Sequence, residues 1–156
     1  MRWRIEVGYR EGVFDALGHL AVQDIRDLGI TGVSEVRTGR IYWIEGDLSE
    51  EEIHRICREL LADPITQEYE FYPADSPPSL PPDAWVVEVR YRPGVTDAVG
   101  DSVVKGVRDM GIDSISRAQT GRKYIIRGNL SKDEIETICR RLLYNDVIET
   151  YDLFGG

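Results

Sequence analysis

Two cysteines, Cys57 and Cys139, and two histidines, His19 and His54, are the side chains with the most scope for chemistry. A thiol can act as a nucleophile and an imidazole as its base. Each cysteine, however, falls within an apolar helical pattern, where an unpaired cysteine behaves as a small hydrophobe. Each histidine falls on the polar side of a predicted helix. We predict packed thiols and solvent-exposed imidazoles, with a redox or catalytic thiol as the alternative.

Glycine-rich and acidic segments indicate no catalytic centre either. Neither G-x-x-x-x-G-K-[ST] nor G-x-G-x-x-G, the phosphate-binding patterns, occurs in the chain. Gly12 and Gly94 fall at predicted strand-to-helix turns, which explains them, although the helix that follows could attract an anion. Two cysteines are too few for a metal cluster. We therefore expect no metal and no cofactor.

Arginine and tyrosine recur around one glycine in each half of the chain, as Arg40 with Tyr42 and Arg122 with Tyr124. Both residue types are enriched at the energetic centres of protein interfaces. The alternative is that the tyrosines pack in the core and the arginines are solvated turn residues.

The neighbouring positions predict an apolar patch on the opposite strand face. Ile41, Trp43 and Ile125 point away from the predicted helices, so another layer must cover them. That layer is either the other half of the chain or a partner protein. Candidate partner contacts are Arg40, Tyr42, Trp43, Arg122, Tyr124 and Ile125.

An internal repeat must position these residues. A shift of 82 residues aligns 3–72 with 85–154 without a gap, and 32 of the 70 positions are identical. Such self-similarity indicates duplication of one structural unit. We predict a first repeat at 1–72, a second at 85–156 and a linker at 73–84. The linker holds five of the seven prolines, which is typical of an extended, semi-rigid spacer.

Alternation and helical spacing predict the same elements in each repeat. Strands are expected at 3–9, 32–38, 40–46 and 65–72, and again at 85–91, 114–120, 122–128 and 147–154. Between the middle two strands, Gly39 and Gly121 predict tight turns. Each repeat then reads β-α-β-β-α-β, an α+β, two-layer sandwich related to the ferredoxin-like motif.

Capping residues and apolar stripes predict the two helices. Asp15 and Asp97 are expected N-caps, and Ser49 with Glu52 has the spacing of a capping box, as has the later pair 131 and 134. The predicted buried stripes are Leu17, Ala21, Ile25 and Leu28 in the first helix and Ile53, Ile56, Cys57, Leu60 and Leu61 in the second, with equivalents in the other repeat.

Charge and composition limit the partners. The net charge of −9 argues against nucleic acid, whose ligands present basic faces. Residues 1–72 carry a net −7 and residues 85–156 a net zero, which suggests different neighbours for the two repeats. No apolar run is long enough to span a membrane. The first residues do not resemble a signal peptide, so we expect a cytoplasmic protein. Repeats this small favour packing as an internal pseudo-dimer, with further homo-oligomers possible.

Several segments together resemble the PurS-type small subunit of phosphoribosylformylglycinamidine synthase. They are residues 93–100 (PGVTDAVG), 36–40 (VRTGR) and 57–65 (CRELLADPI), the last followed by Glu68-Tyr69-Glu70. The likeness covers nearly all of each repeat, as a tandem duplication. It departs from the family where Asp-Ala replaces the usual Asp-Pro, at Asp15 and Asp97, and where Asn145-Asp146-Val147 replaces Asp63-Pro64-Ile65.

The resemblance implies a non-catalytic assembly subunit in purine biosynthesis. Such subunits are usually dimeric and bridge a glutaminase and a synthetase, so that ammonia from glutamine meets the ATP-activated substrate. The tandem chain would then be a covalent form of that dimer. The alternative is an ACT-like module that senses amino acids, because Pro93-Gly94-Val95 also resembles the turn of those domains.

Overall fold

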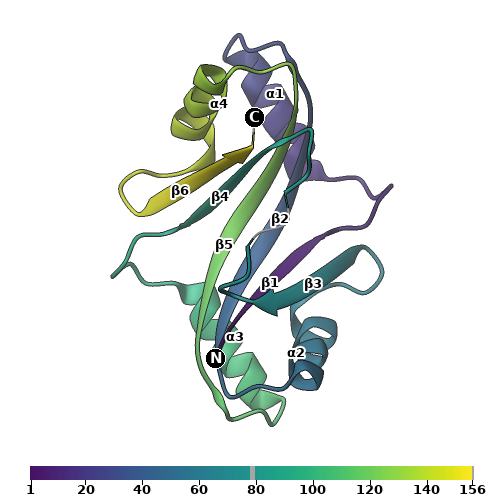
Figure 1. Cartoon of the computed structure of the whole chain (residues 1–156), viewed down its shortest axis with the longest axis vertical. Helices are drawn as coiled ribbons and strands as arrows, with labels where there is room; N and C mark the ends of the chain where they lie inside the picture. The colour runs from purple at the N-terminus through teal and green to yellow at the C-terminus, as the bar shows by residue number, and fades with distance from the viewer. Residues whose placement is uncertain (78–79, 156) are drawn as a thin grey trace. The chain divides into compact units, whose positions relative to one another are not determined.

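The computed structural model describes residues 1–77 and 80–155, in which the same series of elements occurs twice (Figure 1). The first series is β1 (Arg2–Tyr9), α1 (Ala16–Asp27), β2 (Val33–Gly46), α2 (Glu50–Ile56), the π-helical turn η1 (Cys57–Leu61) and β3 (Gln67–Pro73). The second is β4 (Trp85–Tyr91), α3 (Ala98–Asp109), β5 (Ile115–Gly128), α4 (Lys132–Ile138), η2 (Cys139–Leu143) and β6 (Glu149–Gly155). The predicted α+β class, repeated twice, is confirmed.

The predicted linker begins one residue too early. Pro73 belongs to β3, whereas residues 74–77 and 80–84 have turns but neither helix nor strand. Pro78 and Ser79, which the predicted linker includes, lie outside the described residues. No helix among the described residues is long and apolar enough to cross a membrane.

The tight turns predicted at Gly39 and Gly121 are wrong. β2 and β5 each run uninterrupted for 14 residues through these glycines, so each pair of predicted short strands is one long strand. A hairpin turn at these positions requires a positive φ, and neither glycine has one. Gly39 instead pairs with Gly8 of β1 as an ordinary member of the antiparallel ladder.

The long strands run through two compact units, each built from both repeats. The hydrogen-bonded strand order is β3-β1-β2-β5-β4-β6. The first unit contains residues 1–13, 39–77 and 96–121. The second contains residues 14–38, 78–95 and 122–156. Each unit therefore takes one half of β2, one half of β5 and a helix from each repeat.

In the first unit, α2 and α3 pack on the sheet formed by β3, β1 and the adjoining halves of β2 and β5 (Figure 1). β2 and β3 both pair antiparallel with β1. Their register places Ile5 of β1 between Tyr42 of β2 and Phe71 of β3. The core joins side chains of the first repeat to Val103 and Val107 of the second.

In the second unit, α1 and α4 pack on β4, β6 and the other halves of β2 and β5 (Figure 1). β4 and β6 are antiparallel, with Val87 opposite Leu153. Ile25 of α1 is fully buried in the same core as Val87 and Ile135 of the second repeat.

The first helices of the two repeats are thus exchanged between the two compact units. α1 belongs to the first repeat but packs with β4, and α3 belongs to the second but packs with β1. The predicted pairing of the repeats takes this intertwined form. The sequence divides into repeats at 1–72 and 85–156 and a linker at 73–84. That these segments are also the domains of the protein stays a prediction.

Two positions of the predicted helical stripes are wrong. Leu17 is 64% exposed and its equivalent Val99 is 43% exposed, because Gly18 and Gly100 occupy the inward positions instead. Leu60 is also exposed, since the helix widens to a π-turn from Cys57 onward. Widening rotates the later side chains relative to the α-helical stripe.

Candidate functional site

Asp15 joins the start of α1 to the middle of β2 within the second unit. As the predicted N-cap it accepts a hydrogen bond from the Gly18 N–H at 2.8 Å. The same carboxylate accepts the Thr38 N–H at 2.6 Å and the Thr38 hydroxyl at 2.9 Å. Asp15 is 5% exposed, so these bonds replace most of its hydration. The carboxylate fixes where α1 sits on the strand.

Asp97 makes the same connection for α3 in the first unit. It accepts the Gly100 N–H at 2.9 Å, the Thr120 N–H at 2.6 Å and the Thr120 hydroxyl at 3.0 Å. A Cβ on Gly18 would lie 2.0 Å from the Val36 carbonyl oxygen, so the first helix approaches the strand too closely for a side chain. Asp-x-x-Gly at the start of this helix is thus a packing motif that both repeats share.

Arg122 is the most constrained of the predicted contact residues. Its guanidinium donates to both carboxylate oxygens of Glu149, at 2.6 and 3.1 Å, and to the Leu143 carbonyl at 2.9 Å. It also donates to the Tyr124 hydroxyl at 3.2 Å. The side chain therefore ties β5 to η2 and β6 in the second unit.

The pKa values around Arg122 follow from this pairing. Burial lowers the pKa of Arg122, but hydrogen bonds to Glu149 and Tyr124 outweigh it and raise the pKa overall. Burial acts to raise the pKa of Glu149, yet the bonds from Arg122 and from the Asn145 N–H hold it below the ordinary 4.5. Both groups are charged at neutral pH, as a bidentate arginine–carboxylate pair requires.

Arg40, the equivalent residue in the first unit, is exposed instead. In the first unit, Gln67 occupies the position that corresponds to Glu149. Its Oε1 accepts the Asp63 N–H at 2.8 Å, just as Oε1 of Glu149 accepts the Asn145 N–H at 2.8 Å. A neutral amide gives Arg40 no carboxylate to pair with at this position. Tyr42 packs in the first core at 8% exposure, and burial raises its pKa.

Trp43 is 7% exposed and lies on the strand face opposite the helices, as predicted. The guanidinium of Arg4 lies 5.8 Å from the Trp43 ring centre and 6.0 Å from that of Tyr72. Arg4 also donates to Glu6 at 3.2 Å, and the Tyr72 hydroxyl donates a short hydrogen bond to the same carboxylate. The sequence does not indicate this buried cluster, because Arg4 and Glu6 alternate with the core residues of β1, a pattern typical of a strand with one solvated face.

The second repeat replaces most of this cluster with apolar residues. Val86, Ile125 and Phe154 stand where the first repeat has Arg4, Trp43 and Tyr72. Ile125, the remaining predicted contact, is half-buried. The two triplets of predicted contacts fall in different compact units, and only Arg40 among the six is exposed. Their role in binding a partner stays a prediction.

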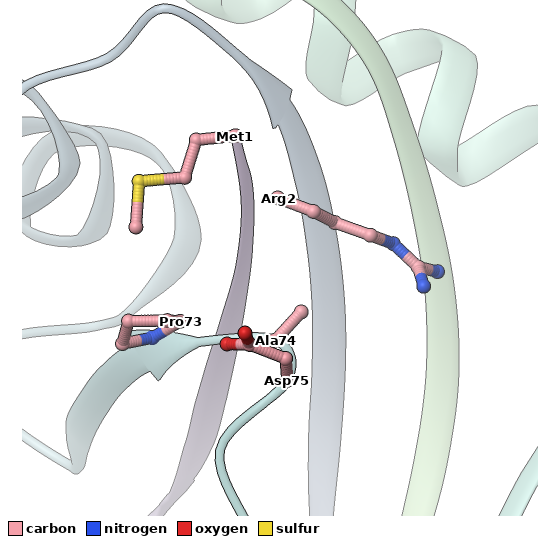
Figure 2. Close-up of a pocket in the computed structure, with 5 residues that line it drawn as sticks. All are labelled: Met1, Arg2, Pro73, Ala74 and Asp75. Atoms are coloured by element: carbon pink, nitrogen blue, oxygen red, sulfur yellow. The ribbon is translucent and has the colours of Figure 1, made fainter.

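A shallow hollow of about 480 Å³ lies at the edge of the first unit, lined by Met1, Arg2, Pro73, Ala74 and Asp75. Figure 2 shows the Arg2 side chain extending away from the other four residues. Its guanidinium donates instead to Gln119 at 3.0 Å. Among the side chains that line the hollow, Asp75 supplies a carboxylate, and none carries a thiol, hydroxyl or imidazole.

The cysteines and histidines occupy the predicted environments. Cys57 and Cys139 are fully buried, which confirms their packing role, and burial raises the pKa of each thiol to about 12. His54 is exposed but lies edge-on to Phe71, with ring centres 4.7 Å apart. His19 is exposed and belongs to the other unit. No group of three metal-ligating side chains is found in the described part of the chain.

Comparison with known families explains the repeat. The family model described as PurS, phosphoribosylformylglycinamidine (FGAM) synthase, matches residues 2–74 and again residues 84–154. The chain belongs to the PurS family. Because the two matches follow each other without overlap, it holds two PurS copies in tandem, as the resemblance in its sequence predicts.

Two relatives illustrate the likeness. The phosphoribosylformylglycinamidine synthase subunit PurS of Synechocystis sp. is 37% identical over 71 residues, which is 42% of this chain and 70% of the relative. The crystal structure of Methanocaldococcus jannaschii PurS, a subunit of formylglycinamide ribonucleotide amidotransferase, is 27% identical with a TM-score of 0.42. It covers 46% of this chain and 92% of its own. Each relative is thus matched by about half of the tandem chain.

Proposed function

We propose that this tandem PurS chain is a non-catalytic assembly subunit of FGAM synthase in purine biosynthesis, in the cytoplasm. It bridges a glutaminase and an ATP-dependent synthetase, so that ammonia released from glutamine reaches the activated substrate. The observation that carries the proposal is the PurS match over both repeats. The fully buried thiols, whose pKa values burial raises to about 12, support a role in assembly, because the reactive thiolate form is disfavoured at neutral pH.

The exchanged helices favour a permanent pair of PurS copies. Each compact unit draws its core from both repeats, so one copy cannot leave without exposing apolar surface of the other. A partner therefore meets both repeats in a fixed arrangement within each unit. A bridging subunit benefits from such rigidity, because less conformational freedom is lost on binding.

Reconstitution with the two enzyme subunits tests the proposal. Amidation of formylglycinamide ribonucleotide is measured with and without this chain, using either glutamine or free ammonia as the nitrogen source. We expect a large loss of rate with glutamine and a smaller loss with ammonia when the chain is omitted, since only glutamine requires coupling of two active sites. Equal glutamine-driven rates in its absence would refute bridging.

The ACT-like sensor makes an opposite prediction. Calorimetry on the isolated chain should show saturable binding of an amino acid at micromolar concentration if the chain is a sensor. The twofold PurS match favours the assembly role, for which no such binding is expected.

A further inference from the structure

Arg40 and Arg122 occupy the same position in the two repeats but differ in their partners. Arg122 donates to both carboxylate oxygens of Glu149, at 2.6 and 3.1 Å, and is half-buried. Arg40 is exposed, and its guanidinium takes part in no hydrogen bond or ion pair with residues 1–77 and 80–155. The first unit therefore keeps the arginine of this pair and lacks the carboxylate.

The register of the sheet brings a second donor to the same place in the first unit. Arg40 of β2 lies opposite Val7 of β1. Gln67 of β3 lies opposite Tyr9, two residues further along β1. Opposite residues and residues two apart share one face of a sheet, so Arg40 and Gln67 project from the same face. They stand where Arg122 and Glu149 are in direct contact in the second unit.

The hydrogen bond of Gln67 decides which end of its amide is free. Its Oε1 accepts the Asp63 N–H at 2.8 Å, as Oε1 of Glu149 accepts the Asn145 N–H. The other end of the Gln67 amide is then an NH2 group, a donor, where the glutamate has an acceptor oxygen. No acceptor bonds this NH2 group in the described part of the chain. Two donors, the NH2 group and the guanidinium of Arg40, are left without the acceptor that the second unit supplies.

We propose that Arg40 and the Gln67 amide form a binding site for a carboxylate that another molecule supplies. The guanidinium would hold it in the bidentate way in which Arg122 holds Glu149, and the Gln67 NH2 group would donate to the same carboxylate. A planar guanidinium matches a carboxylate better than it matches a spherical anion. Free carboxylic acids and acidic side chains share this chemistry. The site is independent of the proposed assembly role.

The surroundings of the site limit its affinity and restrict the ligand. Asp63 replaces the neutral Asn145 of the second unit and adds a negative charge nearby, although its Oδ1 accepts the Ile65 N–H at 2.9 Å. That charge disfavours a doubly charged anion such as phosphate more than a single carboxylate. Because Arg40 is exposed, water and salt weaken the pair. We expect millimolar binding of a small monocarboxylate and weaker binding of phosphate.

Titration of the whole chain with acetate, followed by nuclear magnetic resonance, tests the site directly. The side-chain N–H signals of Arg40 and Gln67 should shift together and saturate, whereas sodium chloride at equal ionic strength should leave them unchanged. N-acetyl-glutamate α-amide, whose one charged group is a side-chain carboxylate, is the second probe. Saturable shifts with both probes assign the site to acidic side chains as well, and shifts with acetate alone assign it to free acids. Equal shifts with chloride, or none with acetate, would overturn the proposal.

The tandem repeat supplies matched variants. Gln67→Glu gives the first unit the carboxylate of the second, so it should fold, pair with Arg40 and weaken acetate binding at least about tenfold, the loss expected for one charged hydrogen bond. Glu149→Gln opens the equivalent position, so the side-chain signals of Arg122 should begin to respond to acetate. Circular dichroism checks the fold of both variants. Undiminished acetate binding by Gln67→Glu would show that the signals report a different site and would overturn the proposal.

Discussion

Replacement of Asp15 by alanine should destabilise the chain by about 2–4 kcal/mol. Loss of a helix N-cap costs about 1 kcal/mol. The two further hydrogen bonds to Thr38, at 2.6 and 2.9 Å, go to a charged acceptor, for which the net contribution is about 1.5–3 kcal/mol each at most. We take less than the full sum because water can reach the unpaired Thr38 groups, which are half-buried.

Urea unfolding followed by circular dichroism measures this cost, as a fall in the midpoint at unchanged slope. Asp15→Asn is the graded control, because the amide oxygen still caps the Gly18 N–H but cannot serve every donor at once. It should cost roughly half as much as alanine. Asp97→Ala is the matched variant in the other unit, since Asp97 makes the same three bonds with Gly100 and Thr120. A cost below about 0.5 kcal/mol for both alanine variants would show that the carboxylates do not hold the helices to the strands.

Three further outcomes follow from the structure. Proteolytic cutting of the linker between residues 73 and 84 should leave the two repeats associated at micromolar concentration, and separate elution of two folded halves would contradict the exchange. Cys57→Ala and Cys139→Ala should each cost roughly 1–2 kcal/mol in urea unfolding, and because burial raises each thiol pKa to about 12, the native thiols should resist alkylation at pH 8. Glu149→Gln should destabilise the chain at neutral pH: the pKa of Glu149 is held below 4.5, so its contribution is present above that value and is lost as the pH falls below it. The difference from wild type should therefore shrink on titration from pH 7 to about 3, and a constant difference would contradict the pairing with Arg122.

Local signals in the sequence predict most of the individual elements. The capping box is present as expected, with the Ser49 N–H donating to Glu52 at 3.0 Å and the Glu52 N–H to Ser49 at 3.1 Å. Asp15 and Asp97 cap their helices. The error at Leu17 arises because glycine carries no hydrophobic signal. The true inward residue Gly18 is therefore invisible to a count of apolar side chains.

Long-range arrangement is where the sequence is insufficient. The two repeats are so alike that α1 would bury nearly the same side chains against the strands of either repeat, so periodicity cannot reveal the exchange. Gly39 predicts a turn from its residue type alone, whereas the continuous β2 depends on pairing with β1 and on the bonds from Thr38 to Asp15. The buried cluster of Arg4, Glu6 and Tyr72 escapes prediction for a similar reason, since charged residues on a strand indicate solvent unless their partners are known.

The exchange of helices also determines when each compact unit can fold during synthesis of the chain. The first unit needs residues 96–121 to complete its core, and the second unit needs residues from 122 onward. Synthesis delivers residues from the N-terminus at about 5–20 per second, so the first repeat must wait several seconds for its covering helix. During that interval β1 and α2 expose apolar side chains such as Ile5 and Ile53. We therefore expect the nascent chain to need protection by chaperones until the ribosome has passed residue 121, however stable the finished fold is.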